Sequence, residues 1–181
     1  MEKDPLYRLK YPIGEFDFAG EITRAVVNGW IDEIEQLTGK LRSVVSKLSD
    51  EQLDKPYRPS GWTLRQVVHH IGDSHLNSYI RFKWTLTEDT PTIKTYFEDR
   101  WAELPDYQRM PVEVSLDFIE LLHIKWVILL RELSDADLQR EFIHPESGAT
   151  PLGKNIGIYA WHGNHHLAHI TRLCERKNWQ I

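Results

Sequence analysis

The sequence predicts an all-α protein, a four-helix up-down bundle with an extended N-terminal arm. Apolar residues recur at helical spacing in four long segments, and no segment shows a convincing strand pattern. Stretches that contain proline and glycine separate these segments. The segments cover residues 21–48, 63–86, 114–133 and 151–177. Packing their apolar stripes against one another produces a bundle, with longer connections between some helices.

The composition indicates one globular domain that spans residues 1–181. Of the 181 residues, 41% are hydrophobic and 27% are charged, as in ordinary globular proteins. The net charge of −5 argues against nucleic-acid binding, and no apolar run reaches the roughly 18 residues of a membrane span. The charged N-terminus lacks the apolar core of a signal peptide, and the single cysteine, Cys174, suits a reducing compartment. We therefore expect a cytoplasmic protein that binds neither nucleic acid nor membranes.

Local signals mark the boundaries in the first half of the chain. Pro12 and Gly14 predict that residues 1–18 are not helical and form an arm packed on the bundle. Ser49 can begin a short helical turn by a capping box. Thr63 and Gln66 form a second capping box, which predicts the start of the second long helix.

The second half of the chain carries weaker signals. Residues 88–111 are acidic and rich in proline, which predicts an irregular segment with a short helix near residues 99–104. Ser134 caps another turn, and residues 144–148 form a loop around Pro145. Thr150 followed by Pro151 predicts the N-cap and first residue of the last helix.

Four of the nine histidines fall inside eight residues of the last helix: His162, His165, His166 and His169. Histidines four apart lie one turn apart on the same helix face, so both can reach one metal ion. A helical wheel places His162 and His166 beside the apolar face. It places His165 and His169 toward two arginines, on the solvent side or behind the ligands. The pair His162 and His166 is therefore the better candidate.

Two familiar metal motifs do not fit this helix. A metalloprotease helix needs Glu directly after its first His, and that position holds Gly163 in one pair and His166 in the other. A di-iron bundle needs Glu-x-x-His on two helices. Glu120 and Glu141 are each followed three residues later by a histidine, but the second of these, His144, precedes a proline and lies outside the helices.

A third ligand must come from another helix, and the second helix carries three histidines. On the wheel His69 points away from the apolar face, His70 lies near its edge and His75 lies near its middle. Periodicity leaves His70 and His75 open and slightly favours His75. Asp73 is a candidate acceptor that orients a ligating imidazole, or a general base.

Three stretches together resemble a known family. Residues 61–75 (GWTLRQVVHHIGDSH) and 159–170 (YAWHGNHHLAHI) resemble the two metal motifs of the DinB/YfiT-like metalloproteins. Residues 11–16 (YPIGEF) and 79–83 (YIRFK) are similar to its YfiT-type subgroup. The resemblance spans nearly the whole chain, with its motifs in the family's order.

The resemblance implies a four-helix bundle that binds one divalent metal ion per subunit, zinc or nickel, through three histidines. The family's first-motif ligand precedes an aliphatic residue, which matches His70 before Ile71, and the second motif matches His162 and His166. The family implies a homodimer and a metal-dependent hydrolase that acts on a small molecule. Its relatives also include bacillithiol-type S-transferases, which use a low-molecular-weight thiol.

Three functions fit these residues. A three-histidine site leaves coordination positions open for water, which favours a hydrolase. The same metal could instead activate the thiol of a cofactor, because Cys174 lies among apolar positions and is a poor candidate for that thiol. A non-enzymatic metal-binding module is the third alternative, and a fourth protein ligand would favour it.

Overall fold

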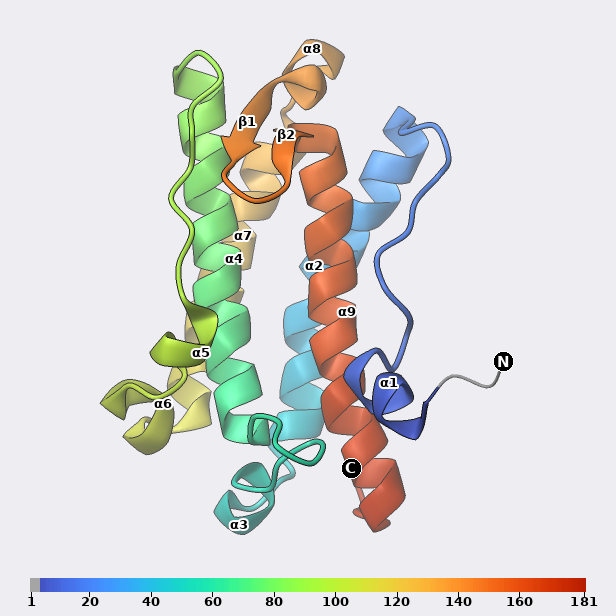
Figure 1. Cartoon of the computed structure of the whole chain (residues 1–181), viewed down its shortest axis with the longest axis vertical. Helices are drawn as coiled ribbons and strands as arrows, with labels where there is room; N and C mark the ends of the chain where they lie inside the picture. The colour runs from blue at the N-terminus through green and yellow to red at the C-terminus, as the bar shows by residue number, and fades with distance from the viewer. Residues whose placement is uncertain (1–3) are drawn as a thin grey trace.

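The computed structural model describes residues 4–181, and four long helices dominate it (Figure 1). They are α2 (Arg24–Val45), α4 (Leu64–Thr87), α7 (Val112–Arg131) and α9 (Leu152–Lys177). The predicted four-helix bundle is therefore confirmed. In the described part of the chain, no helix has the length and apolar character that a bilayer crossing requires.

Short elements connect the long helices. They are α1 (Pro5–Lys10), α3 (Asp50–Leu53), α5 (Glu98–Trp101), α6 (Pro105–Arg109), α8 (Asp135–Gln139), β1 (Glu141–His144) and β2 (Gly148–Pro151). The capping boxes predicted at Ser49 and Thr63 are present, and Ser134 caps α8 in the same way. The helices therefore begin where side-chain oxygens accept their first backbone N–H groups.

The N-terminal arm contains a helix that the sequence reading missed. Asp4 caps α1 by accepting a hydrogen bond from the Leu6 amide, and Pro5 occupies its first position. Both are standard features of a helix start, but the helix is only six residues long and shows no clear apolar period. The prediction that residues 1–18 are wholly non-helical is wrong.

A β-hairpin precedes α9, although no strand was expected. Its antiparallel register pairs Phe142 with Thr150 and His144 with Gly148, and Gly148 adopts a positive φ of 78° in the turn. Thr150 is therefore part of a strand, and Pro151 rather than Thr150 is the N-cap of α9. Four-residue strands are too short for periodicity to reveal.

The order of the connections differs from a simple up-down bundle. His69 contacts Ser115, His75 contacts His123 and Phe82 packs on Trp126, so α4 and α7 run parallel. Residues 88–111 return along the bundle to make this possible (Figure 1). Helices α2 and α9 are also parallel, because Gly157 faces Trp30 and Gly163 faces Leu37. Periodicity identifies helices but carries no information on their direction.

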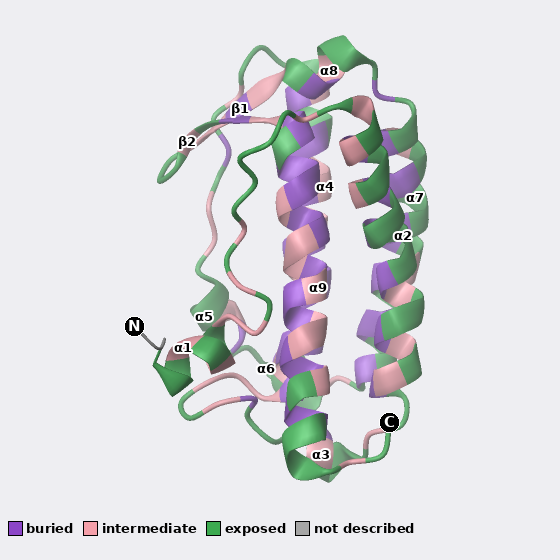
Figure 2. Ribbon diagram, turned by 90° about the vertical axis from the view of Figure 1, so that its right-hand side faces the viewer, coloured by how far each residue is buried: buried purple, intermediate pink, exposed green. Residues whose placement is uncertain are grey.

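Buried residues run along the inner sides of the long helices (Figure 2), and their apolar members form two clusters at different levels of the bundle. One cluster includes Phe82, Trp126 and Ile156, and the other includes Leu64, Ile119 and Ile170. On α9 the last buried residue of the first cluster is Ala160, and the first buried residue of the second cluster is Ile170. The four histidines of α9 lie between these two limits, as His75 does on α4 and His123 on α7, whereas His70 lies at the edge of the second cluster. The metal-site candidates therefore lie near the middle of the bundle.

Candidate metal centre

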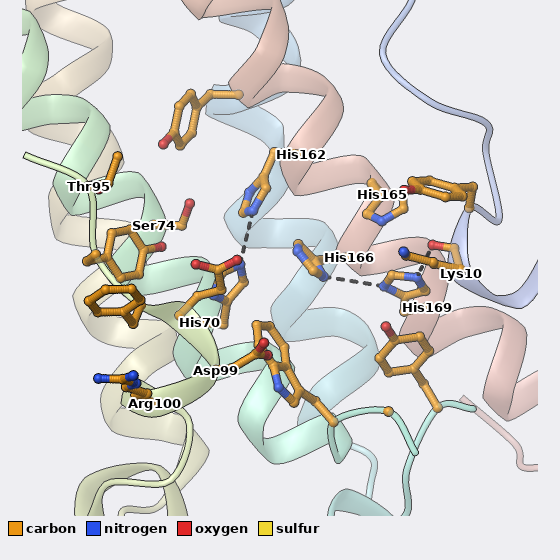
Figure 3. Close-up of a pocket in the computed structure, with 18 of the residues that line it drawn as sticks. Lys10, His70, Ser74, Thr95, Asp99, Arg100, His162, His165, His166 and His169 are labelled. Atoms are coloured by element: carbon orange, nitrogen blue, oxygen red, sulfur yellow. Dashed lines mark hydrogen bonds between the residues drawn. The ribbon is translucent and has the colours of Figure 1, made fainter. Parts of the chain in front are cut away.

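Three histidines from two antiparallel helices converge on one point (Figure 3). One ring nitrogen from each of His70, His162 and His166 lies within 4.8 Å of the other two. His162 and His166 are one turn apart on α9, and His70 faces them from α4. His70 and His166 are buried, whereas His162 is partly exposed. The structure thus brings together the three residues that the family motifs indicated.

His75 is not part of this cluster but lies directly behind it. It is fully buried, and its Nε2 is 3.2 Å from Nδ1 of His162. The wheel preference for His75 over His70 as a member of the cluster is therefore wrong. A wheel locates the middle of the apolar face, whereas the cluster forms at the edge of that face, where the bundle opens.

A chain of hydrogen bonds determines which nitrogen of His162 faces the cluster. The Ile34 carbonyl can only accept, so His123 Nδ1–H donates to it over 2.8 Å and His123 Nε2 must accept. His75 Nδ1–H therefore donates to His123 Nε2 over 2.8 Å, and His75 Nε2 accepts from His162 Nδ1–H. His162 Nε2 is left with a free lone pair that faces the cluster.

A shorter chain orients His166 in the same way. His169 Nε2–H donates to the carbonyl of Lys10 over 3.0 Å, so His169 Nδ1 accepts from Nδ1–H of His166 over 3.3 Å. This leaves Nε2 of His166 with its lone pair. Both chains end on a backbone carbonyl, which is the usual way in which proteins select the tautomer of a ligating imidazole.

His70 completes the cluster, but no chain of hydrogen bonds orients its ring as the two chains orient His162 and His166. Its Nε2 is 3.2 Å from Nε2 of His162, and its ring packs against Trp62 at a centroid distance of 4.7 Å. Nδ1 of His70 is buried and has no hydrogen-bond partner within the described residues. No hydrogen bond within the described residues therefore selects the tautomer of His70, and Nε2 is the nitrogen that it turns toward the two lone pairs of His162 and His166. Three convergent ring nitrogens of this kind are a donor set that a cation can bind.

Burial keeps these imidazoles neutral near pH 7. Desolvation lowers the pKa of His70 to about 4 and holds the pKa values of His162 and His166 well below 6.5. Neighbouring histidines add to the effect at His162 and His166. Neutral imidazole is the form that binds metal ions. The donor set therefore fits a borderline divalent cation such as zinc or nickel.

The prediction that His165 and His169 face solvent is wrong, because the N-terminal arm and the loop between α3 and α4 cover them. Both rings are buried. Tyr57 stacks on His169 at 3.9 Å, and Trp161, which stacks on His165, donates to the Gly14 carbonyl over 3.1 Å. A wheel of α9 alone cannot show a segment that arrives from far away in the sequence. His169 does lie behind a cluster member, as the alternative reading expected.

Asp73 faces away from the histidine cluster. Its carboxylate accepts a hydrogen bond of 2.7 Å from the Tyr107 hydroxyl of α6, and burial raises its pKa. It does not line the pocket around the cluster, so the role in orienting a ligand is not supported. Nearby, His69 is buried beneath α6 and bonds Ser115 over 2.7 Å, although its side of the helix looked polar in the sequence.

The cluster opens into a pocket of ≈ 940 Å³. Residues 88–111, which connect α4 to α7, and the β-hairpin supply much of its lining. They include the carboxylates Glu98, Asp99 and Glu146. Arg81 and Tyr159 line it from the same two helices that carry the cluster. The sequence assigned no site role to Glu98, Asp99 and Glu146, because they belong to connecting segments whose fold is decided by tertiary contacts. Arg81 and Tyr159 appeared only as members of the family-like stretches.

The fold and the side-chain cluster together define a helical-bundle protein with a deep pocket built around three convergent histidines. This chain belongs to the DinB superfamily, whose family model matches residues 33–170. The matched range includes all three histidines of the cluster.

Two similar proteins match nearly the whole length of this chain. An Oceanobacillus iheyensis protein described as a "Putative metal-dependent hydrolase" is 60% identical over 170 residues, which cover 94% of this chain and 98% of that protein. A Bacillus mycoides protein with the same description is 57% identical over 171 residues, with coverage of 94% and 98%.

Two solved structures have related folds. YfiT from Bacillus subtilis, described as "a probable metal-dependent hydrolase with an unusual four-helix bundle topology", superposes with a TM-score of 0.93 at 45% identity. The match covers 96% of this chain and 99% of YfiT. The four-helix bundle protein TT2238 matches at a TM-score of 0.55 and 17% identity, over 81% of this chain and 98% of that one, and supports the fold alone.

Proposed function

We propose that this protein is a metal-dependent hydrolase whose divalent cation, zinc or nickel, is held by His70, His162 and His166. The observation that carries the proposal is the convergence of these three nitrogens within 4.8 Å at the base of an open pocket. The descriptions of the Oceanobacillus protein and of YfiT as metal-dependent hydrolases support it.

The chain's own residues prepare the site for this chemistry. A divalent cation held by three histidines supplies a Lewis acid and keeps positions open for water and substrate. The hydrogen-bond chains through His75 and His169 hold the rings of His162 and His166 in the ligating tautomer. Glu98 and Asp99, which line the pocket from α5, are carboxylates that can accept a proton from an attacking water.

Metal content measured on purified protein tests the ligand set. We expect one zinc or nickel ion per chain in the unaltered protein and in His144→Ala, a histidine of the β-hairpin. We expect much less than one in His70→Ala, His162→Ala and His166→Ala, because two ligands hold a metal far more weakly than three. Loss of metal in His75→Ala with retention in His70→Ala would overturn the assignment.

Turnover tests the reaction class. A panel of small esters, amides and lactones is incubated with the metal-loaded protein, with and without a low-molecular-weight thiol. A hydrolase turns over a panel member without any thiol and loses that activity in His166→Ala. Turnover that depends on added thiol would support the S-transferase instead.

We further propose that the protein forms a homodimer through α7. This helix exposes an apolar stripe that includes Phe118, Leu121, Ile124 and Ile128, and Leu121 is 69% exposed. Such contiguous apolar surface is typical of an interface. Light scattering after gel filtration is expected to report twice the chain mass of 21.3 kDa, and Leu121→Glu is expected to lower it toward that mass.

A further inference from the structure

Arg81 is a buried charge without an acidic partner. It lies on α4, is only 9% exposed and lines the pocket above the histidine cluster. Within the described residues no carboxylate approaches its guanidinium within the 4.0 Å of an ion pair. Its side chain makes one long hydrogen bond, 3.5 Å from Nη1 to the Tyr159 hydroxyl. Within the described residues its other nitrogens have no hydrogen-bond partner, and none of them is completely shut off from solvent.

Other arginines in the structure are satisfied even though they are more exposed. Arg42 and Arg131 each bridge two carboxylates, and Arg65 bonds both Asp50 and Asp54. Arg140 donates to backbone carbonyls. A guanidinium remains charged in proteins, and a buried charge without a partner is costly. Arg81 differs from these arginines because no carboxylate or backbone carbonyl of the described residues accepts a hydrogen bond from it. Its place in the pocket leaves its donors available to an anion that enters from solvent.

The position of Arg81 connects it to the proposed reaction centre. His70, Ser74 and Arg81 are separated by four and seven residues, so all three lie on one face of α4. Long helical side chains lean toward the helix N-terminus, which for Arg81 is the direction of His70. The hydrogen bond to Tyr159, one turn before His162 on α9, places the guanidinium on that side.

The separation suits a small, extended molecule. The Cα atoms of His70 and Arg81 are about 16 Å apart along the helix axis, and the Arg81 side chain, which leans toward His70, covers part of that distance. One substrate molecule a few bonds long would therefore place one group at Arg81 and another at the histidine cluster. The pocket of ≈ 940 Å³ holds such a molecule easily.

We propose that Arg81 binds a carboxylate of the substrate, so that the enzyme hydrolyses a small ester or amide that carries a free carboxylate. The identification as a substrate group rests on the proposed hydrolase function. The planar guanidinium matches a carboxylate, which it can bind through two parallel hydrogen bonds. A phosphate is disfavoured because Glu98, Asp99 and Glu146 line the same pocket and would repel a dianion more strongly than a monoanion.

Calorimetric titration with two matched ligands tests this site. Succinate and its monoamide have the same length, but the monoamide has one carboxylate fewer. We expect zinc-loaded protein to bind succinate at least tenfold more tightly than the monoamide, since charge-assisted hydrogen bonds are strong. In Arg81→Met this preference is expected to fall below twofold, and in Arg81→Lys to be intermediate.

The controls separate binding from folding. Lys83→Met removes one positive charge from the exposed side of the same helix and is expected to keep the full preference for succinate. Arg81→Met is expected to keep its zinc and to resist urea at least as well as the unaltered protein, because it removes an uncompensated buried charge. If Arg81→Met did not fold, Arg81→Lys would carry the comparison.

Measurements on metal-free protein separate a failure of the Arg81 site from a failure of the proposed metal site. We expect acetate to bind metal-free protein weakly, and to bind metal-free Arg81→Met more weakly still. This difference does not depend on whether the three histidines are a metal site. Equal binding of succinate by Arg81→Met and the unaltered protein would overturn the proposal. Binding of methylphosphonate that depends on Arg81, without such dependence for acetate, would overturn the assignment to a carboxylate.

Discussion

The two faces of α9 show how one helix can serve two purposes. Toward α2 the helix presents Gly157 and Gly163. A Cβ atom at Gly157 would lie 2.9 Å from the Trp30 ring, and one at Gly163 would lie 2.3 Å from a methyl carbon of Leu37. Toward α4 the helix presents His162 and His166 and borders an open pocket. One face is dry and closely packed, and the other is polar and concave.

The difference shows where the precision of the site originates. His162 and Gly163 are adjacent in sequence, but about 100° of helix rotation turns them toward different neighbours. The close contact at Gly163 resists a shift of α9 toward α2 or along it, because interiors are dense. The position of α9, and therefore of its histidines, is set by apolar contacts that take no part in binding.

Filling the dry face should have the largest effect. We expect Gly163→Val to lower the free energy of unfolding by about 3 kcal/mol, because Leu37 is buried and has little room to yield. Urea denaturation followed by circular dichroism measures this. A variant as stable as the unaltered protein would show that the contact between α2 and α9 is not tightly packed.

Breaking the hydrogen-bond chain behind His162 should weaken metal binding and leave the packing of α9 on α2 unchanged. We expect His123→Phe to reduce zinc affinity about tenfold, since it leaves His75 Nδ1 without an acceptor and releases the tautomer of His162. Competition with a chromophoric chelator measures the affinity, and nitrogen-15 NMR reports the tautomer.

His123→Gln provides the matched control for this prediction, because its amide can both donate and accept. We expect it to recover part of the zinc affinity and the original tautomer of His162. Equal affinity in His123→Phe and the unaltered protein would show that the chain does not orient the ligand.

The buried histidines outside the cluster should make the metal-free protein sensitive to acid. Burial lowers the pKa values of His69 and His123 to about 4, so below the ordinary value of 6.5 the unfolded chain binds protons that the folded chain does not. Stability therefore falls as the pH falls from about 6.5 toward 4. Between pH 7.5 and 5.5 each of the two should contribute a loss of about 1 kcal/mol.

Urea denaturation of the metal-free protein at the two pH values measures this loss. His69→Gln removes one of the two groups, and its stability is expected to depend less on pH by about that amount. A pH dependence as steep as that of the unaltered protein would show that His69 does not remain neutral in the folded state.

A glycine on the exposed side of α2 should show the smallest effect and the opposite sign. A Cβ atom at Gly29 would meet nothing within 4 Å, so Gly29→Ala adds helix propensity without a clash. We expect it to stabilise the protein by less than about 1 kcal/mol in the same denaturation experiment. Destabilisation would indicate that this surface is covered, for example by a second subunit.

The sequence predicted the parts of this structure that depend on neighbouring residues. Helical periodicity revealed the four long helices, and Thr63 with Gln66 located the start of α4, because a capping box is a local hydrogen-bond pattern. The spacing of His162 and His166 placed both on one side of α9 for the same reason. The short α1 and the hairpin were missed, because each is too short to show a period.

The sequence by itself therefore determined the four helices and two of the three histidines in the cluster, since both follow from the geometry of a single helix. Family motifs rather than periodicity selected His70 over His75. Only the tertiary structure decided that α4 runs parallel to α7, that the N-terminal arm covers His165 and His169, and that Arg81 lies in the pocket without an acidic partner among the described residues. These features join residues far apart in the chain, and their positions depend on how whole helices pack.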